Sequence, residues 1–143
     1  MEMKQSLSIL KLEKLVFDEL SFHRIGIDSN SPIEFRMGVS VVQREDLSIY
    51  RVVLTLNGTK EKEYTIKIVL SGFFSFDADQ SLKEEEKNKI LTQNAVAILM
   101  PYMRSEVSLL TAQPNMECVV LPPFNITNMF NAQNQQSDTS EHP

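Results

Sequence analysis

Apolar and polar residues alternate along three stretches in the first half of the chain. Between residues 33 and 42 every second residue from Ile33 to Val41 is apolar, and the positions between them include Glu34 and Arg36. The same period of two recurs over residues 50–56 and again over residues 64–70. This alternation is the pattern of half-buried strands, so it predicts an antiparallel sheet.

The residues between these stretches predict how the strands connect. Stretch 50–56 ends at Asn57-Gly58, the pair that best tolerates a positive φ in a tight turn, which predicts a hairpin to the third stretch. Gly72 predicts a bulge before the end of that third strand. The first segment, residues 7–22, stays ambiguous, because helical spacing at its start gives way to strand-like alternation at its end.

Helical spacing begins after Ser81, a possible N-cap, and continues to Thr111. Three glutamates at 84–86 occupy the first turns, where the helix dipole favours negative charge. We interpret them as a solvated helix face and not as acid or base groups. Pro101 cannot donate a hydrogen bond to the carbonyl of Ala97, so a break in the helix is predicted between these two residues.

The second half of this helix is apolar on two neighbouring stripes. One stripe includes Leu99 and Met103, and the other includes Ile98, Tyr102 and Leu109. A single sheet covers only one side of a helix, so the other side needs a second partner. We therefore predict a homo-oligomer, with an interface at Pro101, Met103, Val107 and Leu110. The alternative is that both stripes are covered within one subunit.

The chain becomes irregular after Thr111. Pro114, Pro122 and Pro123 favour extended backbone, and Asn125 can cap a short helix over residues 126–130. Residues 131–143 have almost no apolar content and are predicted to be a disordered tail. The domain organisation predicted from this pattern is one domain over residues 1–130, followed by the tail.

Composition narrows the class of protein. The 143 residues, 42% of them hydrophobic, are enough for one core and too few for two ordinary domains. A net charge of -5 without a dense Lys/Arg block argues against nucleic-acid binding. Charged residues interrupt every candidate membrane span or signal core, so we expect a cytoplasmic protein that does not bind membranes. The single cysteine, Cys118, is expected to be a buried thiol.

Residues for catalysis or cofactor binding are not apparent. The four glycines are scattered, so the chain lacks a glycine-rich phosphate loop and nucleotide-driven activity is not expected. His23 and His142 are the only histidines, and neither has metal-ligand spacing to Cys118. We therefore assign no catalytic residue, no metal and no cofactor, and predict that the protein is not an enzyme.

The segment ILMPYMRSEV at residues 98–107 resembles a helix segment of the bacterial SecB export chaperones, in which a Pro-Tyr pair is followed by Arg. Four more segments resemble parts of that family in the same order. They are LSF at 20–22, YRVVLTL at 50–56, SGFFSF at 71–76 and LPPFNITNMF at 121–130. The last of these resembles the family's crossover loop and final helix. The resemblance extends over about residues 12–130.

This resemblance implies an α+β fold, with a long helix packed on a four-stranded antiparallel sheet and a short C-terminal helix. It assigns at least residues 15–22 to a strand, and it implies dimers that associate into a tetramer. The implied function is that of an ATP-independent holdase, which binds unfolded polypeptides for protein export. A branch of such chaperones serves toxin-antitoxin systems, where the client is an unstable antitoxin, and this chain could belong to that branch.

The resemblance also implies two binding surfaces. Clients would bind a groove lined by an apolar set comprising Leu121, Pro122, Pro123, Phe124, Ile126, Met129 and Phe130, with Phe74 and Phe76 as an opposite wall. The prolines would keep that loop extended, and Phe and Met would give it adaptable apolar surface. The family's motor partner, SecA, docks on an acidic sheet surface. Glu19 keeps that character here, whereas His23 and Lys67 replace expected acids, so we expect motor docking to be weak.

A second function remains open on the sequence alone. A long helix across an antiparallel sheet also describes hotdog-type thioesterases, whose catalytic acid or histidine lies on or near the helix. Glu84–Glu86 or Glu106 would then be the candidates for that role. Similarity of fold alone is a weak argument for chemistry, so this alternative ranks below the chaperone.

Overall fold

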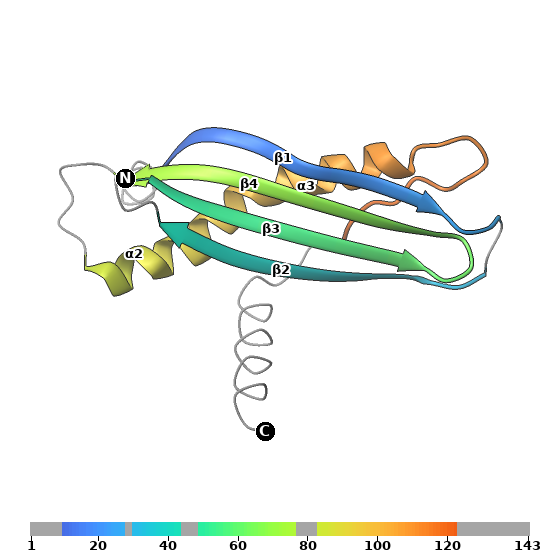
Figure 1. The fold of residues 1–143 in the computed structure, drawn as a ribbon, viewed down its shortest axis with the longest axis horizontal. Coiled ribbons are helices and arrows are strands. Elements are labelled where there is room, and N and C mark those ends of the chain that lie inside the picture. Colours follow the sequence, from blue (N-terminus) through green and yellow to red (C-terminus); the bar gives the residue numbers. More distant parts are fainter. Residues whose placement is uncertain (1–9, 28–29, 44–48, 77–82, 123–143) are drawn as a thin grey trace, which may run out of the picture.

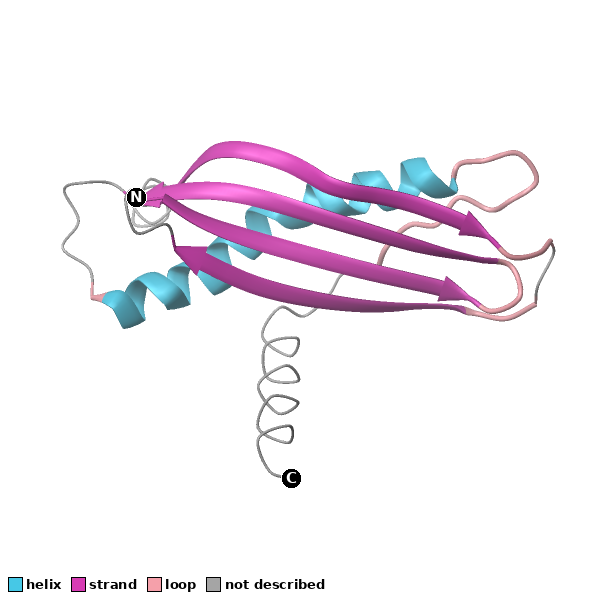
Figure 2. Ribbon diagram, viewed as in Figure 1, coloured by secondary structure: helices cyan, strands magenta, loops and turns pink. Residues whose placement is uncertain are grey.

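The computed structural model describes residues 10–27, 30–43, 49–76 and 83–122, and it consists of one sheet and one long helical region (Figures 1 and 2). The α+β class with a four-stranded antiparallel sheet and a long helix is therefore confirmed. The predicted short helix over 126–130 and the predicted tail lie outside the described residues. The strands are β1 (Leu10–Arg24), β2 (Ile33–Gln43), β3 (Ile49–Lys60) and β4 (Tyr64–Phe76), and the helical region comprises α2 (Glu84–Ile90), a π-helical turn η1 (Leu91–Ala95) and α3 (Val96–Thr111).

The sheet has the order β1-β4-β3-β2, and all three neighbouring pairs are antiparallel. The helical region lies on one face of the sheet and crosses it obliquely, from the β2 side at α2 to the β1 side at the end of α3 (Figure 1). We call the face that carries the helix the inner face and the opposite one the outer face. Directly opposed residues of neighbouring strands point to the same face, so the register assigns each strand residue to one of them.

The hydrophobic core lies between the inner face and the helix. Leu54 of β3 is opposed by Leu70 of β4 and by Val39 of β2, and both leucines are fully buried. The helical region contributes Leu91, Val96, Leu99, Met103 and Val107, each with no exposed surface. The alternation that the sequence showed is therefore the division between these two faces.

The segment that the sequence left ambiguous is the edge strand β1, as the family resemblance implied. It begins earlier than expected, at Leu10, and pairs with β4 along its length. Its irregular apolar spacing has a structural cause, because the register with β4 shifts between Leu12 and Lys14 and again between Phe17 and Glu19. Each shift is a bulge that inserts one residue and changes which face the following residues point to.

The predicted turn at Asn57-Gly58 was wrong. β3 continues through both residues to Lys60, and the turn consists of residues 61–63, in which Lys62 adopts a φ of 66°. Gly58 is required by packing instead of by a turn. A Cβ at Gly58 would lie 2.8 Å from Cγ1 of Ile66 and 2.9 Å from Cε1 of Phe35, so glycine allows the Phe35 ring to lie across β3.

The predicted bulge at Gly72 was also wrong, because β4 pairs with both of its neighbours through this residue. Gly72 lies on the inner face, next to the side chain of Leu99 from α3. A Cβ there would lie 2.7 Å from Cδ2 of Leu99 and 2.7 Å from Cε2 of Phe74. The absent side chain is therefore what allows Leu99 of α3 to reach the strand.

The predicted helix break between Ala97 and Pro101 is absent, since α3 runs from Val96 to Thr111 with Pro101 inside it. Ala97 and Pro101 are both exposed. Water can therefore bond to the carbonyl of Ala97, which loses its amide donor to the proline. The irregular turn of the helix lies earlier, in the π-helical residues of η1.

Candidate client-binding and docking surfaces

Helix α3 presents one apolar stripe to the core and a second one to solvent. Of the residues predicted as an oligomer interface, Met103 and Val107 are fully buried against the sheet, Leu110 is half-buried and Pro101 is exposed. The outward stripe contains Tyr102, which is 43% exposed, and Leu109, which is 67% exposed. An interface with another subunit would therefore have to use the outward residues of α3, because the sheet already covers Met103 and Val107.

The residues after α3 fold back along it as a return segment, Ala112–Pro122. Side chains at the end of the helix hold this segment in place. The Ser108 hydroxyl donates to the carbonyl of Val119 at 3.0 Å, and the amide of Val119 donates to Oγ1 of Thr111 at 2.8 Å. Leu121 is then fully buried in the core. The return segment is thus anchored at both of these points, immediately before the described residues end at Pro122.

An open groove of about 650 Å³ runs between α3 and the return segment, and we call it the helix groove. Leu109 and Val120 are its most exposed apolar residues, with Val120 71% exposed. Among the described residues, Arg104 is the one charged residue of its lining, and Ser105 and Ser108 add hydroxyl groups. The lining within the described part of the chain is Pro101, Arg104, Ser105, Ser108, Leu109, Ala112, Cys118 and Val120. A mostly apolar, open groove suits a protein or peptide partner better than a small polar substrate.

Four of the predicted client-binding residues lie in the described part of the chain. Leu121 and Phe74 are fully buried, Phe76 is half-buried and Pro122 is exposed. Phe76 packs edge-on against Tyr50 with ring centroids 5.5 Å apart. Pro123, Phe124, Ile126, Met129 and Phe130 lie outside the described residues. The client-site prediction therefore remains a prediction, although Phe74 is placed as a core residue.

The residues that give the helix groove its shape could not be identified from the sequence. Arg104 and Ser108 are polar residues on an exposed side of the helix, and the fold-back that joins Ser108 to Val119 has no local signal in the sequence. Cys118, expected to be buried, is exposed in the groove. Its apolar neighbours suggested burial, but an extended segment on the protein surface exposes alternate residues.

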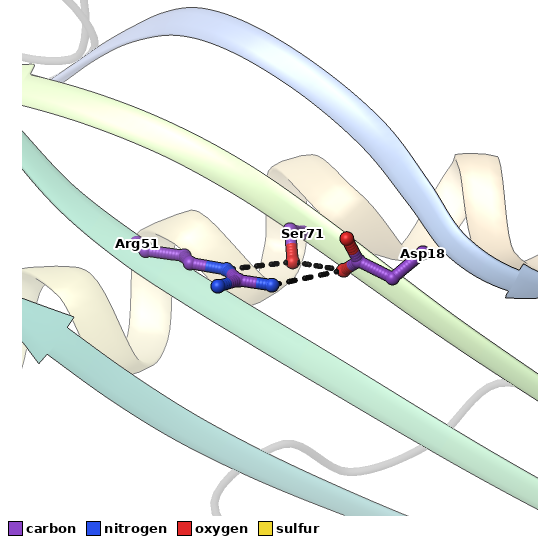
Figure 3. Close-up of polar contacts among 3 residues, drawn as sticks. All are labelled: Asp18, Arg51 and Ser71. Carbon is purple, nitrogen blue, oxygen red and sulfur yellow. Dashed lines mark hydrogen bonds and ion pairs between the residues drawn. The ribbon is translucent and has the colours of Figure 1, made fainter.

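The outer face carries a polar network that joins three strands (Figure 3). Arg51 of β3 donates to the Ser71 hydroxyl at 3.0 Å and to the Asp18 carboxylate at 3.2 Å, and Ser71 in turn donates to the same carboxylate. Ser71 is completely buried beneath these side chains. Asp18 is the residue inserted by the second bulge of β1, so the bulge directs its carboxylate towards β4.

Glu19, the predicted docking residue, is exposed on the outer face beside Lys67. Its carboxylate lies 4.0 Å from Nζ of Lys67 and accepts a hydrogen bond from the Ser21 hydroxyl at 3.2 Å. His23 follows on the same strand and is exposed. The structure therefore brings Glu19 and Lys67 together, and the lysine offsets the charge that a basic partner would meet.

The described residues offer little for catalysis. They contain no group of three or more His, Cys, Asp or Glu side chains that could hold a metal ion. Glu84, Glu85 and Glu86 are exposed on α2, as expected for a solvated face. Burial raises the pKa of Tyr64, and the nearby Glu63 carboxylate raises it further, which disfavours ionisation. No helix in the described part has the length and apolar character needed to cross a membrane.

Comparison with known proteins identifies the family. The family model for SecB, described as preprotein translocase subunit SecB, matches residues 5–137. The protein-export protein SecB of Nitrosospira multiformis is 27% identical over 149 aligned positions, which cover 98% of this chain and 92% of that protein. An uncharacterized protein of Methanocaldococcus jannaschii is 49% identical over 37 residues, but that match covers 26% of this chain and only 24% of the archaeal protein.

Solved structures share the fold. The SecB-like chaperone Rv1957 of Mycobacterium tuberculosis, in complex with a peptide from the HigA1 antitoxin, matches with a TM-score of 0.70 and 12% identity, over 85% of this chain and 92% of that chain. A Streptococcus agalactiae protein of unknown function matches with a TM-score of 0.51 and 14% identity, over 80% and 97%. At these identities the structures support the fold alone. Because the family model covers most of the sequence, the chain belongs to the SecB family.

Proposed function

We propose that this protein is an ATP-independent holdase, which binds unfolded polypeptides and delays their folding or aggregation. The observation that carries the proposal is the match of the SecB family model to residues 5–137. The open, mostly apolar helix groove supports it, since adaptable apolar surface is what a promiscuous polypeptide binder needs. As in its family, the protein would work in the cytoplasm without a cofactor.

The matched family is a chaperone family, so the prediction that the protein is not an enzyme is confirmed. The thioesterase alternative loses its basis with that result. Its candidate residues give it no support either, because Glu84–Glu86 are exposed and Glu106 does not line the helix groove.

Two client types fit the proposal, and we favour a dedicated client over general export. The reason is the weak docking to the SecA motor that we expect, since Lys67 lies 4.0 Å from the Glu19 carboxylate and offsets its charge. The solved relative with an antitoxin peptide illustrates a dedicated client for a protein of this fold. Chaperoning of an antitoxin is therefore the more specific candidate, and delivery of preproteins for export is the alternative.

We further propose that the protein is a homo-oligomer, a dimer or a tetramer, that associates through the outward stripe of α3. Tyr102 and Leu109 leave apolar surface in solvent that the subunit itself does not cover. Burial of such residues contributes roughly 1.5–3 kcal/mol per large side chain, which favours association. The clients would then bind next to this interface, along the end of the return segment and residues 123–130, which the sequence predicts to bind clients.

A refolding assay tests the chaperone proposal. Several unrelated proteins are denatured and diluted into buffer with and without the purified protein, in the absence of ATP. We expect arrest of refolding at stoichiometric amounts of the protein, with release when a tighter-binding unfolded chain is added. Normal refolding of every client would refute the holdase. Arrest or protection of an antitoxin alone would assign the dedicated branch, and salt-sensitive tight binding to SecA would assign export.

A further inference from the structure

The outer face has a charge balance unlike that of the whole chain. The net charge of the chain is -5, yet the strand residues of the outer face include more cations than carboxylates. The register assigns most of them to this face, and the bulge residues Glu13 and Asp18 are counted because they reach Ser75 and Ser71. The cations are Lys11, Lys14, Arg36, Arg51 and Lys67, and the carboxylates are Glu13, Asp18, Glu19 and Glu34. The excess negative charge of the protein therefore lies elsewhere.

Three of these four carboxylates are engaged within the sheet. Both bulges of β1 insert an acidic residue, and each inserted acid accepts a hydrogen bond from a serine of β4. Glu13 accepts from Ser75 at 2.6 Å, and Asp18 accepts from Ser71 and pairs with Arg51. Glu19 pairs with Lys67, as described above. Serine donors and paired cations reduce what these carboxylates can offer to a basic partner.

Two cations keep their charge available. Lys14 and Arg36 make no ion pair within the described residues, and both are exposed. Lys14 lies 6.0 Å from the ring centroid of Phe73, and Arg51 lies 5.8 Å from the same ring on the neighbouring strand. Contact with an aromatic ring leaves the hydrogen-bond donors of the ammonium group open to an anion.

Lys14, Phe73 and Arg51 belong to a continuous row across all four strands, whereas Arg36 lies on β2 six residues before Val42 and opposes Asn57. Lys14 of β1 is opposed by Phe73 of β4, which is opposed by Arg51 of β3, which is opposed by Val42 of β2. We call this the Phe73 row. Val42 is 51% exposed, although it is apolar. The row thus alternates cation, aromatic, cation and apolar residue, on a face that no helix of the described part covers (Figure 1).

We propose that the outer face is a docking surface for an acidic peptide segment, which crosses the strands from Lys14 in the Phe73 row towards Arg36 on β2. Carboxylates of the partner would pair with Lys14 and Arg36, and an apolar side chain between them would contact Phe73. This surface differs in charge from one that receives a basic partner, and it lies opposite the helix groove. A peptide fits better than a nucleic acid, because the carboxylates interspersed on this face would repel a continuous row of phosphates.

Binding of labelled synthetic peptides tests this proposal. Three peptides of about ten residues alternate Leu with Glu, Gln or Lys, and each contains one Tyr. We expect the Glu peptide to bind at least about tenfold more tightly than the Gln peptide at low ionic strength, with the difference shrinking at high salt. The Lys peptide should bind most weakly. A Lys peptide that binds as tightly as the Glu peptide would overturn the proposal.

A matched pair of variants locates the surface. Lys14→Glu combined with Arg36→Glu removes the two available cations and breaks no ion pair of the described residues. Lys83→Glu combined with Lys89→Glu changes the net charge equally, at exposed positions at and within α2. We expect the first variant to bind the Glu peptide about tenfold or more weakly than the wild-type protein. The second variant should change the affinity for this peptide by less than about twofold. Equal weakening by both variants would refute a local site.

Two further measurements complete the test. Circular dichroism of the Lys14→Glu, Arg36→Glu variant should match the wild-type protein, and the variant should still arrest refolding, because the helix groove lies on the other side of the sheet. A single-stranded oligonucleotide that binds more tightly than the Glu peptide would contradict the proposal. Peptide binding is measured directly, so this test stands even if the holdase proposal fails.

Discussion

Gly26 lies so close to the backbone of Lys62 that the structure leaves no room for a side chain there. The amides of Ile25 and Gly26 both donate to the carbonyl of Glu63, at 2.8 and 3.0 Å, and this joins the end of β1 to the β3–β4 turn. A Cβ at Gly26 would lie 2.3 Å from the carbonyl oxygen of Lys62, which is backbone and cannot rotate away. Gly58 is crowded as well, but by the side chains of Phe35 and Ile66.

We predict that Gly26→Ala destabilises the protein by about 1–3 kcal/mol, because the two backbone segments must separate. Gly58→Ala should cost less, since side chains can adjust their rotamers by small movements. Urea denaturation of both variants, monitored by circular dichroism, measures the difference. If Gly26→Ala were as stable as wild type, the close contact with Lys62 would not be present in solution.

Tyr64 provides a pH test of the packing at the same end of the sheet. It is buried and stacks on Phe22 with ring centroids 5.2 Å apart. Burial is the main cause of its raised pKa, Glu63 raises it further and Arg24 lowers it. The folded protein therefore holds the phenol proton more tightly than the unfolded chain, whose tyrosine titrates near pH 10.

The free energy of unfolding should consequently be unaffected below pH 10 and should fall as the pH rises above 10, where the unfolded chain ionises first. The Tyr64→Phe variant should lack this part of the decrease in the free energy of unfolding at alkaline pH. Tyr102→Phe, at an exposed position of α3, should retain it. Thermal melts of the three proteins from neutral to alkaline pH make the comparison, and identical alkaline profiles for wild type and Tyr64→Phe would contradict it.

Among the elements, α3 combines a core function with a proposed interface. Met103 is fully buried and Leu109 is 67% exposed, although both are apolar and lie less than two turns apart on the same helix. We predict that Met103→Asp unfolds the protein or costs at least about 3 kcal/mol, because it buries an unpaired charge. Leu109→Asp should leave the fold intact and shift the oligomer towards smaller species, which light scattering measures together with circular dichroism. If light scattering showed the wild-type protein to be a monomer, the proposed interface would be refuted.

The strands could be predicted from the sequence because apolar residues alternate with polar ones where one side of a strand faces the core and the other faces solvent. The strands over residues 33–42 and 64–70 were therefore predicted correctly. The errors came from residues whose role depends on another element. Gly58 and Gly72 are glycines because Phe35 and Leu99 come close to them, and a sequence read locally assigns such glycines to turns or bulges.

The same limit explains what was missed in the candidate sites. The bulges of β1 decide that Asp18 reaches Ser71 and that Glu13 reaches Ser75, and a bulge is set by pairing with β4. The helix was expected to break at Pro101, because its partner carbonyl at Ala97 loses a donor. Both residues are exposed, so water can replace the lost bond, and α3 continues through Pro101.

At the scale of the molecule, the sheet separates two surfaces of different chemistry. The helix side presents the apolar helix groove, and the outer face presents paired charges around the Phe73 row. A holdase that must be recognised by a partner while it holds a client needs two surfaces that can be occupied together. The sheet provides this separation, because its own residues and the helix fill the space between the two surfaces.

The predicted client site can be tested with three phenylalanines that differ in position. Phe124 and Phe130 lie in the segment predicted to bind clients, outside the described residues, whereas Phe74 is fully buried in the core. We predict that Phe124→Ala combined with Phe130→Ala weakens binding of an unfolded client by about tenfold or more, because apolar contact area is lost, with little change in thermal stability. Phe74→Ala should instead cost about 3–5 kcal/mol, as large-to-small changes in a core do. Binding is measured by fluorescence anisotropy with a labelled unfolded client, alongside thermal melts. Unchanged client binding by the double variant would show that clients bind elsewhere, and loss of its folded structure would show that these two rings belong to the core.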